Sequence, residues 1–182
     1  CILQPPCSVA STGSDTTSYV SDDWDDVNEA LIPFEKDNVY NNINQKCNAC
    51  TFIGQQIMKR WTKYAYKLKK WSKKKKLTKA KAAINKACTD FSTMQICLTG
   101  DKGFQDFNVL MQSGIISNIN MNGKFTKHLS ALCNVLKPRL IDVGIHDKMT
   151  NVEKIYDYNL QLNICQEIIP ACGKRKNGEN KD

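Results

Sequence analysis

Apolar residues recur with helical spacing in the stretch that begins at Cys47. They follow one another at intervals of three or four residues, which places them on one face of an α-helix. The face comprises Cys50, Ile53, Ile57, Trp61, Tyr64, Leu68 and Trp71. The pattern predicts one helix that continues to about Trp71 and packs its aromatic stripe in the core.

Helical patterns also recur downstream. Residues 77–97 predict a second helix, and a third, short helix is expected around residues 104–111. Residues 113–123 are compatible with either a loop or a short strand. A fourth helix over residues 125–143 contains Pro138, which should bend or split it.

A fifth helix is predicted to begin near Thr150 and to end before Pro170. Thr150 is expected to be its N-cap, because Glu153 stands three residues later as in a capping box. Together, these patterns predict an all-α bundle of about five helices, with a core domain over residues 46–172 and a polar tail over residues 173–182.

Turn-forming and acidic residues characterise residues 1–45, which predict an irregular, partly ordered arm. A short helix is expected at residues 27–32, stopped by Pro33. The alternative is that the acidic arm lies across the lysine-rich helix and screens its charge. In both cases the sequence has an acidic N-terminal segment followed by a basic domain.

The formal charge of +8 is unevenly distributed along the chain. Residues 1–46 contain two lysines and eight acidic residues, whereas residues 47–182 contain 24 basic and 10 acidic residues. Between Lys59 and Lys86 there are 13 Lys or Arg residues and no acid. A solvated face is the ordinary explanation for such a run, but solubilising surfaces usually mix both signs.

Nine cysteines in 182 residues are typical of an oxidising compartment. A zinc centre needs converging pairs, and only Cys47 and Cys50 have that spacing, so no metal or other cofactor is predicted. The chain begins at Cys1 without Met, which we interpret as a mature protein whose signal peptide has been removed. No apolar run is long enough to span a membrane.

Two cysteine pairs lie at the ends of predicted helices. Cys47 and Cys50 open the first helix, and Cys165 and Cys172 stand at the end of the fifth. If these helices are antiparallel, the natural assignment is Cys47–Cys172 and Cys50–Cys165. Each bridge would close a loop of more than a hundred residues and contribute about 4–5 kcal/mol to stability.

This cysteine pattern resembles the saposin-like fold over residues 47–172, and most closely its canopy branch. Cys88 and Cys133 match the family's middle pair, with the long insertion typical of canopy proteins between them. The resemblance implies a Cys88–Cys133 disulfide, whereas the short spacing to Cys97 would instead fit a Cys88–Cys97 bridge. In the canopy arrangement Cys97 is an extra cysteine.

The other two extra cysteines, Cys1 and Cys7, lie in the arm. A tentative Cys7–Cys97 bridge would then attach the arm to the core.

The resemblance also implies a range of functions. Saposin-like proteins bind lipids, perturb membranes or act on partner proteins, and canopy-like members assist protein folding in the endoplasmic reticulum. The chain ends in Glu-Asn-Lys-Asp without a KDEL-like retention signal, which favours a secreted relative.

Catalytic motifs are not evident in the sequence. It contains no HExxH, P-loop or GxGxxG, and no Ser/His/Asp set can be assembled. Cys47-x-x-Cys50 lacks the βαβ context of a redox site and is predicted to be structural. His128 and His146 are expected at the surface, so a non-enzymatic protein is predicted.

The basic run is therefore the candidate binding site. Lysine favours diffuse charge attraction over the bidentate contacts of arginine, which argues against nucleic acid as the ligand. The expected partner is an anionic extracellular one, namely a glycosaminoglycan or an acidic protein. Alternatives are a membrane-active protein that binds anionic lipid and a canopy-like folding helper. The predicted polyanion-binding residues are Lys59, Arg60, Lys63, Lys67, Lys69, Lys70, Lys73, Lys74, Lys75, Lys76, Lys79 and Lys81.

Overall fold

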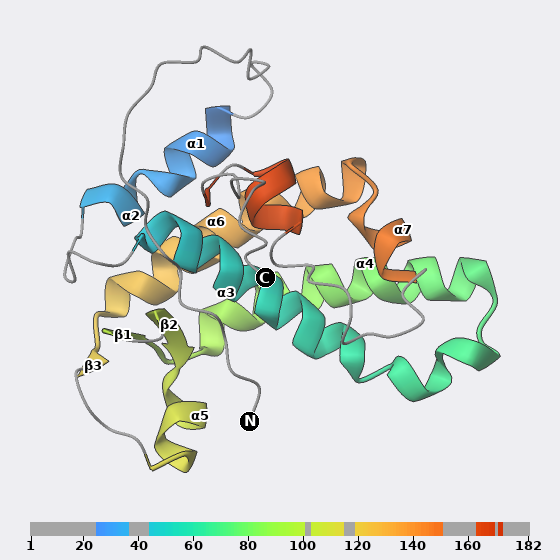
Figure 1. The fold of residues 1–182 in the computed structure, drawn as a ribbon, viewed down its shortest axis with the longest axis horizontal. Helices are drawn as coiled ribbons and strands as arrows, with labels where there is room; N and C mark the ends of the chain where they lie inside the picture. Colours follow the sequence, from blue (N-terminus) through green and yellow to red (C-terminus); the bar gives the residue numbers. More distant parts are fainter. Residues whose placement is uncertain are drawn as a thin grey trace, which may run out of the picture.

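The computed structural model describes residues 25–36, 44–100, 103–114, 119–150, 163–169 and 171–172. Helices dominate this part of the chain and pack around α3, α4 and α6 (Figure 1). In chain order the elements are α1 (Asp25–Leu31), α2 (Pro33–Lys36), α3 (Gln45–Thr62), the 3₁₀-helix η2 (Ala65–Lys70), α4 (Lys73–Asp90), the 3₁₀-helix η3 (Phe91–Thr93), β1 (Ile96–Thr99), β2 (Gly103–Asp106), α5 (Phe107–Gln112), β3 (Ile119–Asn120), α6 (Gly123–Asp142), α7 (Ile145–Thr150) and the π-helix η4 (Asn163–Ile168).

Helices α3 and α4 pack against each other as a hairpin (Figure 1). Asn44 caps α3, because its side-chain oxygen accepts a hydrogen bond from the Cys47 amide at 3.0 Å. The predicted first helix is correct only as far as Thr62, where the chain leaves the α-helix and enters η2. Leu68 is nevertheless 8% exposed, so the apolar stripe still faces inward beyond the break.

The predicted fourth helix is confirmed as α6. Its apolar stripe of Leu129, Leu132, Leu136 and Leu140 is fully buried. Pro138 lies inside the helix without splitting it. Its ring removes one backbone donor, but the buried leucines hold the two sides of the helix in the core.

A small sheet makes the fold mostly helical rather than all-α. The predicted second helix is wrong beyond Asp90, because residues 96–99 form β1. The expected third helix begins only at Phe107, and Phe104 lies in β2. The strand order is β2-β1-β3, both pairings are antiparallel, and Leu98 lies opposite Phe104.

The elements at either end of the described chain differ from the expected helices. Pro33 does not simply stop the first helix but begins α2, where its missing N–H costs nothing. Asp26 of α1 forms an ion pair with Arg139 of α6 at 3.3 Å, so this acidic segment packs on α6. Thr150 is the last residue of α7 and not the start of a helix. Most of the predicted fifth helix lies outside the described residues.

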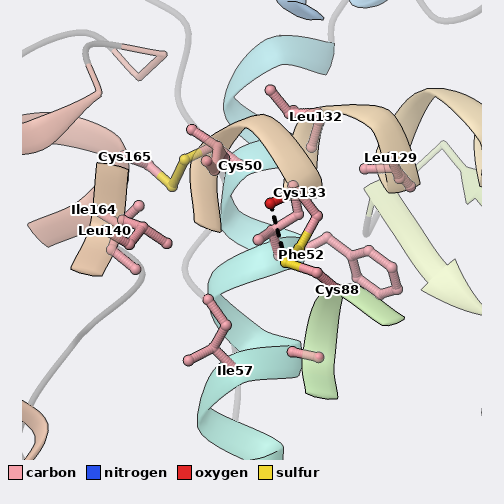
Figure 2. Packing of buried hydrophobic residues seen from close by; sticks show 14 of the residues in the cluster. Cys50, Phe52, Ile57, Cys88, Leu129, Leu132, Cys133, Leu140, Ile164 and Cys165 are labelled. Atoms are coloured by element: carbon pink, nitrogen blue, oxygen red, sulfur yellow. Dashed lines mark hydrogen bonds between the residues drawn. A yellow bond between two sulfur atoms is a disulfide. The ribbon is translucent and has the colours of Figure 1, made fainter. Parts of the chain in front are cut away.

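Three disulfides connect the helices in a nested order. They join Cys47 to Cys172, Cys50 to Cys165 and Cys88 to Cys133, as expected. Figure 2 shows the second and third bridges among buried apolar side chains.

Cys97 is a free and buried thiol, so it forms neither the Cys88–Cys97 bridge nor the tentative Cys7–Cys97 bridge. Burial raises the pKa of the Cys97 thiol. Cys1 and Cys7 lie outside the described residues. The three disulfides indicate an oxidising compartment, and no helix within the described ranges is both long and apolar enough to cross a membrane.

Gly103 at the start of β2 provides a first test of this packing. Its φ of +71° is unfavourable for other residues, and an added Cβ would lie 2.4 Å from Oδ1 of Asn48 on α3. We expect Gly103→Ala to lower the free energy of unfolding by about 1–3 kcal/mol in urea denaturation. Gly123→Ala, where an added Cβ meets nothing within 4 Å, is the control and should change stability little. Equal effects of the two substitutions would contradict this packing.

Candidate polyanion-binding surface

The turn of the α3–α4 hairpin carries most of the lysines predicted to bind polyanions. Figure 1 shows this turn at one end of the molecule, away from the sheet and α5. The lysines come from the end of α3, from η2 and from the first half of α4. We call them the lysine surface: Lys59, Lys63, Lys67, Lys69, Lys70, Lys73, Lys74, Lys75, Lys76, Lys79 and Lys81.

Most side chains of the lysine surface are exposed to solvent. Lys76 and Lys79 are the half-buried exceptions. Lys67 makes a further contact within the protein. For the other lysines of the surface, no salt bridge to a carboxylate is found within the described residues, so their charges are not neutralised by a neighbouring acid there.

The N-terminus of α4 adds to the positive potential of the lysine surface. The first turn holds the four consecutive lysines of residues 73–76 and no acidic residue. Backbone dipoles place partial positive charge at this end of a helix, so cations here are unfavourable. Ser72 compensates in part, because its hydroxyl oxygen accepts the Lys75 amide at 3.4 Å. An anion bound at this turn would relieve the remaining repulsion.

Aromatic rings lie beneath part of the lysine surface. The rings of Trp61 and Tyr64 have centroids 6.2 Å apart, and those of Tyr64 and Trp71 are 5.5 Å apart. The ammonium of Lys75 lies 5.3 Å from the centroid of Trp71, and that of Lys79 lies 5.8 Å from the centroid of Tyr64. Such cation–π contacts contribute about 0.5–1 kcal/mol each at exposed sites.

Arg60 differs from the lysines with which it was predicted to act. Its guanidinium forms an ion pair with Asp90, the last residue of α4, and Lys86 contacts the same carboxylate at 2.7 Å. The Asp90 side chain is only 13% exposed. Arg60 therefore links the two helices, and its charge is compensated within the fold.

Asp90→Asn tests this link between α3 and α4. Because the substitution leaves a half-buried guanidinium without its counter-charge, we expect the free energy of unfolding to fall by about 1–2 kcal/mol. Asp142→Asn at the exposed end of α6 is the matched control, expected to change stability by less than about 0.5 kcal/mol. Urea denaturation of both variants measures the difference, and equal effects would argue against a structural role for the ion pair.

The remaining candidate groups for chemistry are dispersed or already bonded. Cys47 and Cys50 are in disulfides and are not a dithiol. His146 was expected at the surface but is buried on α7, with its Nε2 3.7 Å from an Asp147 carboxylate oxygen. His128 is half-buried and its ring meets the edge of Phe34. Within the described ranges, no three His, Cys, Asp or Glu side chains converge as metal ligands would.

Comparison with known proteins adds no relative. No protein-family model matches the sequence, and neither curated proteins nor solved structures gave a match.

Proposed function

We propose that this protein is a secreted, non-enzymatic binding protein whose lysine surface engages an anionic extracellular partner. The observation that carries the proposal is the segregation of charge on the hairpin. The acid closest in sequence after the lysine run is Asp90, and it is already paired with Arg60 and Lys86 at the other end of α4. A concentrated, uncompensated positive surface raises the local concentration of anions and their rate of association.

We further propose a saposin-like fold of the canopy type. The nested order of the three bridges supports it, because the first cysteine of the domain pairs with the last and the middle cysteines pair with each other. The sheet and α5 occupy the insertion between Cys88 and Cys133. A folding helper in the secretory pathway remains the function that this resemblance implies, but no feature of the described residues favours it over binding.

A membrane-active function is less well supported than binding in solution. Trp61 is fully buried, and Leu68 is 8% exposed. To place this stripe in a bilayer, the hairpin would have to open and give up the contacts between α3 and α4. Vesicle leakage at physiological salt would favour this alternative over the proposal.

Heparin binding with charge-reversed variants tests the proposed function. We compare Lys73→Glu/Lys74→Glu on α4 with Lys124→Glu/Lys127→Glu, which makes the same change of charge near the start of α6. All four lysines are exposed. The α4 variant should elute from a heparin column at much lower salt than the wild type, whereas the α6 variant should stay close to the wild type. Equal shifts would show that only net charge matters, and a wild type that elutes at or below physiological salt would contradict the proposal.

A further inference from the structure

Two lysines of the lysine surface lie over aromatic rings that restrain them. Lys75 and Lys79 are one helical turn apart on α4, so their side chains lie on the same face. Their ammonium groups sit over Trp71 and Tyr64 respectively. With Lys67 set aside, the other lysines of the surface make no such ring contact within the described residues.

The rings that position these lysines are themselves fixed by the core. Trp61 is 0% exposed, and Tyr64 and Trp71 pack against the core while remaining half-buried. A lysine that is already restrained loses less conformational freedom when it binds an anion. Lys75 and Lys79 are therefore preorganised, and the exposed lysines around them contribute mainly long-range attraction.

The surroundings of this pair indicate what class of ligand it takes. Protein interfaces usually have an apolar or aromatic centre, and membrane binding requires exposed apolar side chains. Among the side chains that the structure describes, which leave out residues 65 and 66 of η2, the exposed large apolar ones all lie outside the hairpin, at Ile32, Val109, Met111, Met121 and Val143. The described side chains of the hairpin thus offer charge without an exposed apolar anchor, which suits a hydrophilic polymer with closely spaced anionic groups.

We propose that the hairpin binds a sulfated polysaccharide, with Lys75 and Lys79 as its main sulfate-binding cations and Trp71 and Tyr64 as positioning residues. This inference rests on the proposed function and narrows its partner. Lysine is suited to the role because its ammonium contacts a sulfate oxygen as a point charge.

The first experiment compares two double neutralisations of the same helix by titration with heparin at fixed salt. Lys75→Gln/Lys79→Gln should weaken binding at least about tenfold, because it removes the preorganised cations. Lys73→Gln/Lys74→Gln removes the same charge from unrestrained side chains and should weaken binding about threefold. Equal losses in the two variants would overturn the inference.

A second experiment retains every charge and changes only the ring beneath Lys75. Trp71→Leu should weaken heparin binding several-fold with an unchanged dependence on salt, because the same number of cations still contacts the ligand. Trp71→Phe retains a ring and should recover part of the loss. Circular dichroism and urea denaturation identify the folded fraction, and wild-type affinity in folded Trp71→Leu would contradict the positioning role.

The ligand class is tested with three probes at the same ionic strength. Heparin should bind the wild type more tightly than poly-glutamate or vesicles that contain anionic phosphatidylserine. If poly-glutamate binds more tightly than heparin, the inference of a polysaccharide ligand is wrong, but the proposed binding of an anionic partner still holds. If vesicles bind most tightly, the ligand is an anionic lipid surface. If none of the three probes binds, the proposed function fails and this inference fails with it.

Discussion

Replacing Cys88 and Cys133 together by alanine is expected to lower the free energy of unfolding by about 4 kcal/mol. The bridge joins residues 45 apart in sequence. Removing it raises the conformational entropy of the unfolded chain, which destabilises the folded state. Both cysteines are at most 1% exposed, so the substitutions also remove packed sulfur atoms from the core. Figure 2 shows the bridge among buried apolar side chains. Urea denaturation under non-reducing conditions measures the loss.

Cys97→Ala separates the effect of the covalent bond from that of the lost sulfur atoms. Cys97 is also buried, but its thiol is free, so its replacement removes packing without opening a loop. We expect it to cost about 1 kcal/mol. If the double substitution at Cys88 and Cys133 lowers the free energy of unfolding no more than Cys97→Ala does, the covalent bond adds nothing to the packing of its sulfur atoms. The stabilising role assigned to the bridge would then be wrong.

The parts of the fold that the sequence predicts are those that depend on periodicity or on paired cysteines. The stripe of leucines in α6 repeats over about three turns, and its burial follows directly from that repeat. The outer bridges follow from two cysteine pairs at the ends of helices, because only an antiparallel arrangement brings them within bonding distance. Both signals extend over many residues and are little affected by local detail.

The sheet is harder to predict because its strands are too short to show a period. In β1 all four residues, Ile96 to Thr99, are buried, so the run lacks the alternation of a half-exposed strand. Its apolar residues therefore fit the helical spacing of α4, and for this reason they were included in the predicted second helix. Gly103 at the start of β2 has a positive φ, a conformation that favours glycine.

The break after α3 is a tertiary effect. No Gly or Pro stands between Trp61 and Trp71, so nothing in the local sequence marks the end of the helix. Repeated lysines weaken a continuing helix by like-charge repulsion, and the turn brings the rings of Tyr64 and Trp71 together against the core. Packing across the hairpin outweighs helical propensity here.

The candidate site was predicted as a set of charges but not as an arrangement. Trp71 precedes the N-cap Ser72 and has an extended backbone, so helical spacing does not predict its contact with Lys75 in the first turn of α4. Lys79 and Tyr64 meet across the hairpin turn, and Arg60 and Asp90 meet across the two helices, so neither contact has a local signature. The ring contacts distinguish Lys75 and Lys79 within the lysine surface, and the ion pair with Asp90 removes Arg60 from the predicted binding residues.

Raising salt from 50 to 200 mM is expected to weaken heparin binding by about 300- to 2,000-fold, which is the largest effect predicted for this protein. Sulfated chains, like nucleic acids, release condensed counterions when cations bind, and affinity then falls as a power of salt concentration. The estimate assumes about six lysine contacts with a slope like that of single-stranded or duplex nucleic acid. Isothermal titration at four salt concentrations gives the slope directly.

The lysine variants determine whether this salt dependence arises at the hairpin. Lys75→Gln/Lys79→Gln should reduce the slope of log affinity against log salt by about 1.4–1.8, because two contacts are lost. Lys124→Gln/Lys127→Gln on α6 should leave it unchanged, since those lysines lie outside the lysine surface. An affinity that does not vary with salt would mean that charge does not drive binding. A slope reduced equally by both pairs would place the contacts over the whole basic domain, and the concentration of lysines on the hairpin would then have no special role.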